Sequence, residues 1–189
     1  MNAPQNHQPK TIYADDDTES VSLLLRLRVP SLVLGLFLGL GISLLTSRFE
    51  EVLATNVHVA FFIPFIVYIA AAVGSQTSAI YSRNLKSRHT KLRNYLFKEP
   101  LLGLCLGVIF GLASLFIVNV WLEDMRLASA VGLSTFLAIT IAPVIAITVT
   151  EIIQELHEDP AVGAAPIATV VQDMISIIIY GLVTSALLL

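Results

Sequence analysis

Long apolar runs alternate with short charged segments along the chain. Five runs are each near or above the ~20 residues that a helix needs to cross a bilayer. They cover residues 29–47, 52–81, 101–122, 127–150 and 161–189. Of all Asp, Glu, Lys, Arg and His residues, these runs contain only His58 and Asp173. A soluble core of this length would be interrupted by turns and charges, so the pattern predicts five transmembrane helices.

The predicted fold is therefore an all-α integral membrane protein. Its helices are expected at about 29–47, 52–82, 100–122, 127–155 and 164–189, within one domain that covers residues 26–189. Residues 1–25 are polar, contain Pro4 and Pro9, and are predicted to form a disordered tail. This tail has no apolar central region, so it does not resemble a cleavable signal peptide.

Composition narrows the function classes. The chain is 56% hydrophobic and only 13% charged, whereas soluble domains are about a quarter charged. Its single cysteine, Cys105, excludes an internal disulfide. The sequence has no clustered His/Glu set, no nucleophile beside a base and no phosphate-binding glycine loop, so an enzyme is not expected. The expected partner is the lipid bilayer, and no nucleic-acid partner is expected.

The distribution of positive charge predicts the orientation, because Lys and Arg are enriched on the cytoplasmic side. Nine of them lie before the first helix or between the second and third helices, and two lie on the other face. The nine are Lys10, Arg26, Arg28, Arg83, Lys86, Arg88, Lys91, Arg93 and Lys98, and the two are Arg48 and Arg126. We expect a multi-pass protein of the inner (plasma) membrane with its N-terminus in the cytoplasm and its C-terminus outside.

Small residues recur at intervals of four in two helices. Gly35 and Gly39 lie in the first helix, and Gly103, Gly107 and Gly111 lie in the third. This spacing creates a flat strip where two helix backbones can approach closely. It predicts a tight bundle or a dimer and says nothing about chemistry.

The second predicted helix contains an unusual polar patch. Its 30 residues would extend ~45 Å if straight, which is too long for an upright crossing. Pro64 can kink it. Beyond Pro64 the side chains become small or polar at Gly74, Ser75, Gln76 and Thr77. The patch either packs against a neighbouring helix or lines a polar path.

Asp173 is the one acidic residue within the apolar runs. Placing an aspartate at the centre of a membrane helix costs ~2.5–3.5 kcal/mol, so such residues usually face a cavity or a partner. No Lys or Arg lies in any of the five runs, and His58 lies near the opposite face. The carboxylate is interpreted as a binding group for a cation in transit. A proton carrier, or a structural hydrogen bond to Gln76 or a threonine, are the alternatives.

The surroundings of Asp173 favour hard oxygen ligands. Thr169 is one helical turn earlier on the same face. The stretch "DPAVGAAPIAT" at residues 159–169 is rich in Pro, Gly and Ala, and is predicted to leave backbone carbonyls free beside a cavity. Carboxylate and carbonyl oxygens suit Mg²⁺ or Ca²⁺, and Mg²⁺ needs few protein ligands while it keeps its water. A symmetric dimer would bring two Asp173 side chains to one axis.

Several carboxylates are candidate mouth residues of such a path. Glu151 and Glu155 share a helix face and precede Asp159, on the predicted inner side. An acidic cluster there would concentrate cations, although a solvated helix end is an equal alternative. Glu50 and Glu99, near the ends of other predicted helices, are further candidates for the path or for helix capping.

A set of short motifs follows the same order and spacing as in a known family. They are "RVP" at 28–30, "FE" at 49–50, Pro64 with "GSQ" at 74–76 and Arg83, "FKE" at 97–99, "GLCLG" at 103–107, "VGLS" at 131–134, and "DPA" at 159–161 with Pro166 and Asp173. Together they resemble the transmembrane domain of the MgtE family of magnesium channels across residues 28–189.

The resemblance implies a homodimer of five-helix subunits with a pore at the dimer axis, lined by the second and fifth helices. It implies Mg²⁺, among divalent cations, as the transported ion. Asp173 is implied as the central metal-binding carboxylate, with Thr169 as a further metal-site position. The implied pore-lining positions are Ala72, Gly74, Ser75, Gln76, Ala165 and Pro166.

The sequence also departs from the family pattern. The family usually has Gly-Gly-Asn before Gly74, where this chain has Ala71, Ala72 and Val73, and an Asn often precedes the proline that matches Pro166, where Ala165 stands here. No counterpart of the family's cytoplasmic sensor is expected in residues 1–25, so such gating would require a separate regulatory chain. The predicted function is divalent cation transport. A non-conducting membrane subunit, or a carrier for another cation, is the alternative.

Overall fold

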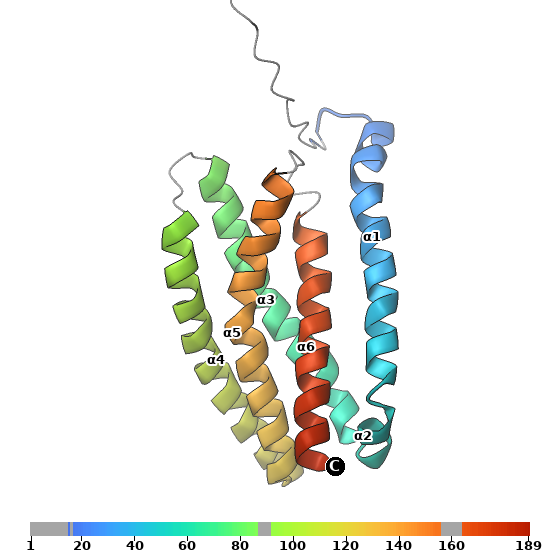
Figure 1. Cartoon of the computed structure of the whole chain (residues 1–189), viewed down its shortest axis with the longest axis vertical. Coiled ribbons are helices and arrows are strands. Elements are labelled where there is room, and N and C mark those ends of the chain that lie inside the picture. The colour runs from blue at the N-terminus through green and yellow to red at the C-terminus, as the bar shows by residue number, and fades with distance from the viewer. Residues whose placement is uncertain (1–14, 16, 87–91, 156–163) are drawn as a thin grey trace, which may run out of the picture.

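The structure is a computed structural model that describes residues 15, 17–86, 92–155 and 164–189, and these residues form a bundle of helices (Figure 1). The helices are α1 (Val21–Ser47), α2 (Glu50–Thr55), α3 (His58–Lys86), α4 (Leu92–Leu122), α5 (Met125–Glu155) and α6 (Ala164–Leu188). All except α2 are long and apolar enough to cross a membrane. The prediction of an all-α protein with five membrane-spanning helices is therefore confirmed.

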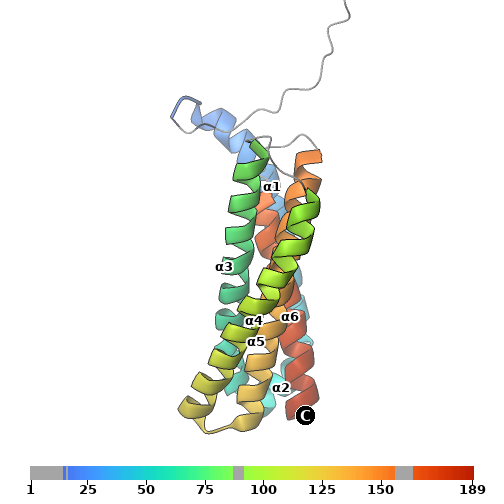
Figure 2. The ribbon, with the colours of Figure 1, turned by 90° about the vertical axis from the view of Figure 1, so that its left-hand side faces the viewer.

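The bundle is organised around α5. This helix packs against α3, α4 and α6. Helix α1 makes its extensive contacts with α6. In Figure 1, α1 accordingly stands at one edge of the bundle and α4 at the other. Figure 2 shows the first turns of α1, in blue, leaning away from the bundle axis. Pro30 lies inside α1, where its missing N–H removes one helical hydrogen bond.

The helix expected over residues 52–82 is two helices in the structure. α2 ends at Thr55 and α3 begins at His58. Between them Asn56 adopts an extended conformation, with φ −140° and ψ 99°, and its side-chain oxygen accepts a hydrogen bond from the His58 amide at 3.0 Å. An asparagine side chain that bonds to a nearby backbone amide in this way replaces a helical hydrogen bond and favours a turn. The chain therefore breaks at Asn56, whereas α3 continues as one helix through Pro64.

Other helices begin earlier than the apolar runs. α1 begins at Val21, inside the tail expected to be disordered, and the Ser20 side chain accepts a hydrogen bond from the Leu23 amide at its start. A serine at this position satisfies an amide that has no partner in the helix. α4 begins at Leu92 rather than at about residue 100, because polar residues of helix ends also adopt helical geometry outside the apolar span.

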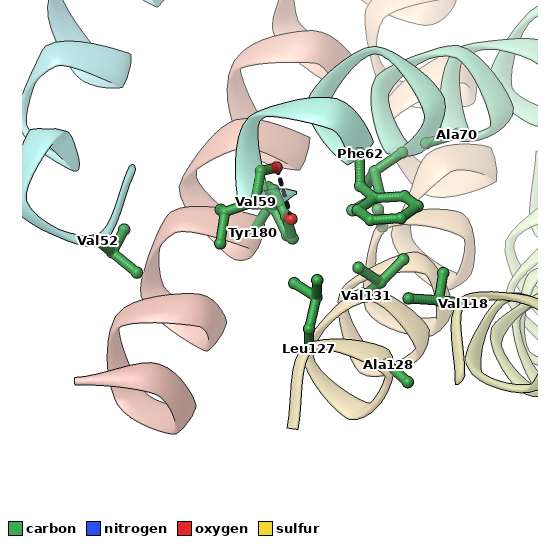
Figure 3. Packing of buried hydrophobic residues seen from close by; sticks show 11 residues of the cluster. Val52, Val59, Phe62, Ala70, Val118, Leu127, Ala128, Val131 and Tyr180 are labelled. Carbon is green, nitrogen blue, oxygen red and sulfur yellow. Dashed lines mark hydrogen bonds between the residues drawn. The ribbon is translucent and has the colours of Figure 1, made fainter. Parts of the chain in front are cut away.

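One apolar cluster holds the helices together at the end of the bundle that carries α2 (Figure 3). Val59 and Phe62 of α3 meet Leu127 of α5 and Tyr180 of α6 there, and all four are buried. The Tyr180 hydroxyl donates a hydrogen bond to the Val59 carbonyl at 2.8 Å. A buried hydroxyl needs such a partner, so this bond fixes the rotation of α6 relative to α3.

A candidate cation site on helix α6

Three contacts define which way each face of α6 points. Gln172 faces α5, because its amide nitrogen lies 3.3 Å from the Ala138 carbonyl. Tyr180 faces α3 through its hydrogen bond to Val59. Met174 faces α1, since its terminal methyl group lies 3.9 Å from the position that a Cβ would take at Gly41. Successive helical residues are rotated by about 100°, so Asp173 lies on the face of α6 between α1 and α3.

One oxygen of the Asp173 carboxylate has no hydrogen-bond partner among the described residues. The side chain is half-buried, and its Oδ1 atom is buried without a hydrogen-bond partner among the described residues. The structural alternative, a bond from Gln76 or a threonine, is therefore not formed at this oxygen. Native proteins rarely leave a buried polar atom unsatisfied without a functional reason.

A groove lies beside α2, and Ile177 is its lining residue from α6. It has a volume of about 730 Å³ and is lined by α1, α2, α3 and α6. Ile177, one turn beyond Asp173, forms part of its floor, and Ser43, Ser47 and Glu50 contribute polar groups to its walls. Glu50 is exposed. The candidate mouth residue Glu50 thus lines the same groove as Ile177, whereas Asp173 is not among its lining residues.

Thr169 is one turn before Asp173, and its side chain is exposed. The backbone around it differs from the prediction of free carbonyls, because α6 is helical from Ala164 onward. Pro166 lies in the first turn, where helix amides have no partner and proline is favoured. Proline therefore begins this helix rather than interrupting it. Residues 156–163, which include Asp159, lie outside the described residues.

The polar patch of α3 divides between two roles. Gly74 is buried against α5, where an added Cβ would lie 3.6 Å from the Ala142 carbonyl, which supports the packing interpretation. Ser75 and Gln76 are exposed and Ala72 is half-buried. Ser75 lines a cavity together with Thr169, whereas Ala72, Gln76 and Pro166 do not. Ala165 lies in the first turn of α6.

Two candidate mouth carboxylates form contacts between helices. A Glu99 oxygen accepts a hydrogen bond from the Thr77 hydroxyl at 2.9 Å, which joins α4 to α3. Glu151 of α5 accepts a hydrogen bond from the Tyr81 hydroxyl of α3. These bonds give both carboxylates a structural role in the subunit. Glu155 lies at the last position of α5.

Gln172 is a buried polar residue that the sequence analysis did not single out. Its side chain is only 2% exposed, and its amide nitrogen also donates to the Ser176 hydroxyl at 3.1 Å. The sequence signal for it is an uncharged polar residue within an apolar run, directly before Asp173. Within the ranges that the structure describes, no three His, Cys, Asp or Glu side chains cluster as a metal site.

Comparison with known proteins gives a consistent match. A family model described as "MgtE: Divalent cation transporter" matches residues 63–183. The chain is 31% identical over 156 residues to the magnesium transporter MgtE of Enterococcus faecalis, which covers 81% of this chain and 34% of that protein. It is 28% identical over 156 residues to the magnesium transporter MgtE of Bacillus subtilis, covering 81% and 35%.

A third relative is the magnesium transporter MgtE of Thermus thermophilus. It is 28% identical over 176 residues, which covers 91% of this chain and 38% of that protein. The chain therefore spans just over a third of the length of these relatives.

Proposed function

The chain belongs to the MgtE family of divalent cation transporters, and from this premise we propose that it moves Mg²⁺ across a membrane through a site at Asp173. The observation that carries the proposal is the buried Oδ1 atom of Asp173, which has no hydrogen-bond partner among the described residues. A carboxylate in this position favours a ligand that supplies positive charge. A cation in transit supplies it without a permanent partner in the fold.

The chemistry of the face around Asp173 favours a hydrated divalent cation. Thr169 adds a hydroxyl oxygen one turn away, and Ala72 and Ala165 add no polar side chain. Carboxylate, hydroxyl and water oxygens are the ligands that Mg²⁺ and Ca²⁺ prefer. Mg²⁺ loses its water reluctantly and is held by one or two carboxylates.

A second copy of the chain would complete this site. Asp173 faces the side of α6 between α1 and α3, and α1 has no buried residue. A symmetric dimer that covers this side would place two Asp173 carboxylates on one axis. Their combined charge would balance a divalent ion, which a single carboxylate does not.

We further propose that both the N-terminus and the connection between α3 and α4 lie in the cytoplasm. This orientation rests on the sequence, in which nine Lys and Arg residues belong to the segments expected on the cytoplasmic side and two to the segments expected on the other. It places Glu50 at the outer opening of the path and Glu151 near the inner one.

The test is growth of a bacterial strain that lacks its own Mg²⁺ uptake and survives only in high Mg²⁺. The wild-type chain and Asp173→Asn are expressed to equal membrane levels and compared in low Mg²⁺. We expect growth with the wild type and none with the variant, because the amide keeps the shape of the side chain but removes its charge. Equal growth of both strains would refute the site.

An absence of growth with either protein would instead favour the alternative of a non-conducting membrane subunit. That reading is motivated by Ala72 and Ala165, where the family usually has Asn. Co-purification of the chain with another membrane protein, and no divalent flux from the pure chain, are its specific expectations.

A further inference from the structure

An apolar groove lies on the outside of the bundle where α4 crosses α5. Its volume is about 480 Å³, within the range of about 300–1,000 Å³ that is typical of protein sites for small molecules. Gly111 and Gly132 line it at the crossing, where a Cβ added to Gly132 would lie 2.8 Å from the Gly111 carbonyl oxygen. Leu112 and Leu133 also line it, and both side chains are exposed. The close crossing thus creates a groove that opens toward the surroundings of the bundle.

The groove has the length and the walls that suit a hydrocarbon chain. Its α5 residues extend from Ser129 to Phe136, which is ~10 Å at 1.5 Å per residue. One leaflet contributes ~15 Å to the hydrocarbon core of a bilayer. Apart from Ser129, every residue that lines the groove is apolar or glycine. A lipid acyl chain therefore fits the groove better than a polar molecule does.

A cationic side chain lies beyond the end of the groove that is nearest the α4–α5 turn. Arg126 precedes Ser129 by three residues and Leu133 by seven, so these side chains share one face of α5. Figure 2 shows this turn at the lower end of the bundle. Trp121, exposed at the same end of α4, is of the residue type that concentrates at the level of the lipid headgroups. Arg126 is therefore placed to meet a headgroup.

Two observations on Arg126 favour an external anion as its partner. Its side chain is exposed and forms no ion pair with another described residue. It is also the second residue of α5, and a positive charge at the N-terminus of a helix is opposed by the helix dipole. The carboxylate of Asp124 already accepts hydrogen bonds from the Arg126 and Leu127 backbone amides, at 3.0 Å each. A phosphate would balance the guanidinium and can accept two of its hydrogen bonds.

We propose that this groove binds one phospholipid, with an acyl chain between α4 and α5 and the phosphate on Arg126. The headgroup that matches the turn is phosphatidylethanolamine, because the exposed Glu123, three residues before Arg126, supplies a negative charge for its ammonium group. A second copy of the chain matches this place less well. Its expected contact is beside α1, and Figure 1 shows α1 and α4 at opposite edges of the bundle. The lipid site does not rest on the transport function proposed above.

The headgroup contact is tested by native mass spectrometry of the full chain in detergent, titrated with dioleoyl phosphatidylethanolamine. Arg126→Gln is expected to weaken binding about tenfold, the effect of losing one hydrogen bond to a charged group. Arg48→Gln is the matched control, since Arg48 is exposed and does not line the groove, and it should bind like the wild type. Dioleoylglycerol has the same acyl chains without the phosphate, so the wild type and Arg126→Gln should bind it equally.

The acyl-chain contact is tested by filling the groove. Val108 lines it and is exposed, so Val108→Trp places a large ring in the groove without replacing a core residue. Val120 is an exposed valine of the same helix that does not line the groove, which makes Val120→Trp the matched control. We expect Val108→Trp to abolish the binding of both lipids and Val120→Trp to leave both unchanged.

Three outcomes would overturn the proposal. Equal lipid binding by the wild type, Arg126→Gln and Val108→Trp would remove the site. Loss of binding in Val108→Trp with none in Arg126→Gln would remove the phosphate from Arg126. A change from dimer to monomer in Val108→Trp, read as mass in the same spectra, would make the groove an interface between copies instead. None of these measurements involves ion flux, so they are separate from the test of transport.

Discussion

The glycines of α4 and those of α1 share one spacing but have different surroundings. In α4, a Cβ added to Gly107 would lie 2.6 Å from the Thr140 hydroxyl oxygen and 2.7 Å from the Phe136 carbonyl of α5. In α1, a Cβ added to Gly39 would meet nothing within 4 Å. The first glycine allows two backbones to approach inside the subunit, while the second leaves an open strip.

The difference shows that small residues at intervals of four indicate a helix face capable of close packing. The spacing does not identify which helix packs against that face. The α4–α5 pair is an interface completed inside one chain. On the α1 side of the molecule the outer helix has no buried residue. Next to it lies Asp173, whose Oδ1 atom has no hydrogen-bond partner in the described part of the chain. We infer that the α4–α5 side of the bundle stabilises the subunit, and we call it the scaffold. The α1 side carries Asp173 and is available for contact with a partner, and we call it the working surface.

The largest expected effect comes from exchanging glycine for leucine on the two sides. Gly107→Leu would force α4 and α5 apart, and overpacking of this kind costs about 3 kcal/mol or more when backbone must move. Gly39→Leu is expected to leave the stability of the subunit unchanged. The thermal midpoints of the purified proteins, measured in detergent by size-exclusion chromatography with fluorescence detection, check both.

The oligomeric state sharpens the same comparison. If Gly39 faces a second copy, Gly39→Leu will convert a dimer to a stable monomer. Equal losses of thermal stability in the two glycine variants would contradict the division into scaffold and working surface.

A smaller and opposite effect is expected at Asp173. Asp173→Leu removes a carboxylate that the fold does not satisfy, so it should raise the free energy of unfolding by about 1–2 kcal/mol, part of the cost that insertion scales assign to a central aspartate. Function would be lost as stability is gained. Denaturation of the detergent-solubilised variant measures the change, with Asp173→Asn as the isosteric control. A large destabilisation would show that the carboxylate is part of the scaffold.

The carboxyl of Glu99 is the scaffold counterpart of Asp173. Its hydrogen bond from Thr77 should contribute about 1–1.5 kcal/mol, near the lower range for hydrogen bonds to carboxyl groups. A double-mutant cycle with Thr77→Val and Glu99→Gln isolates this coupling from other losses. A coupling energy near zero would remove the bond from the list of interactions that tie α3 to α4.

The smallest expected effect is that of Tyr180→Phe. It removes the hydrogen bond to the Val59 carbonyl but keeps the buried ring, so the loss should be about 1 kcal/mol. The thermal midpoint measures this loss, and Tyr68→Phe, at an exposed residue of α3, is the matched control. Identical shifts for the two tyrosines would show that the bond does not orient α6.

The sequence predicted the membrane-spanning helices because long apolar runs have few other stable forms. It missed the break within the helix predicted over residues 52–82, since one Asn56 side chain decides this break through a local hydrogen bond. It also predicted free carbonyls over residues 159–169, whereas the described part of this stretch, from Ala164 onward, belongs to the regular helix α6. Local capping geometry, rather than hydrophobicity, sets these details.

The candidate site was only partly predictable. Asp173 could be identified as a candidate because it is a charged residue in an apolar run. Its Oδ1 atom has no hydrogen-bond partner among the described residues, which agrees with a site for an external ligand. The use of Glu99 and Glu151 in contacts between helices depends on distances that no sequence pattern contains. The same is true of Gln172, whose amide nitrogen is directed by the Ala138 carbonyl on another helix.

The central claim is that Asp173 binds the transported cation, and Mg²⁺ influx into liposomes that contain only the purified chain tests it most directly. The wild type, Asp173→Asn and Glu123→Gln, a control at an exposed carboxylate between α4 and α5, are compared at equal protein content. The account predicts influx for the wild type and Glu123→Gln and none for Asp173→Asn. Wild-type influx through the Asp173→Asn variant would contradict it.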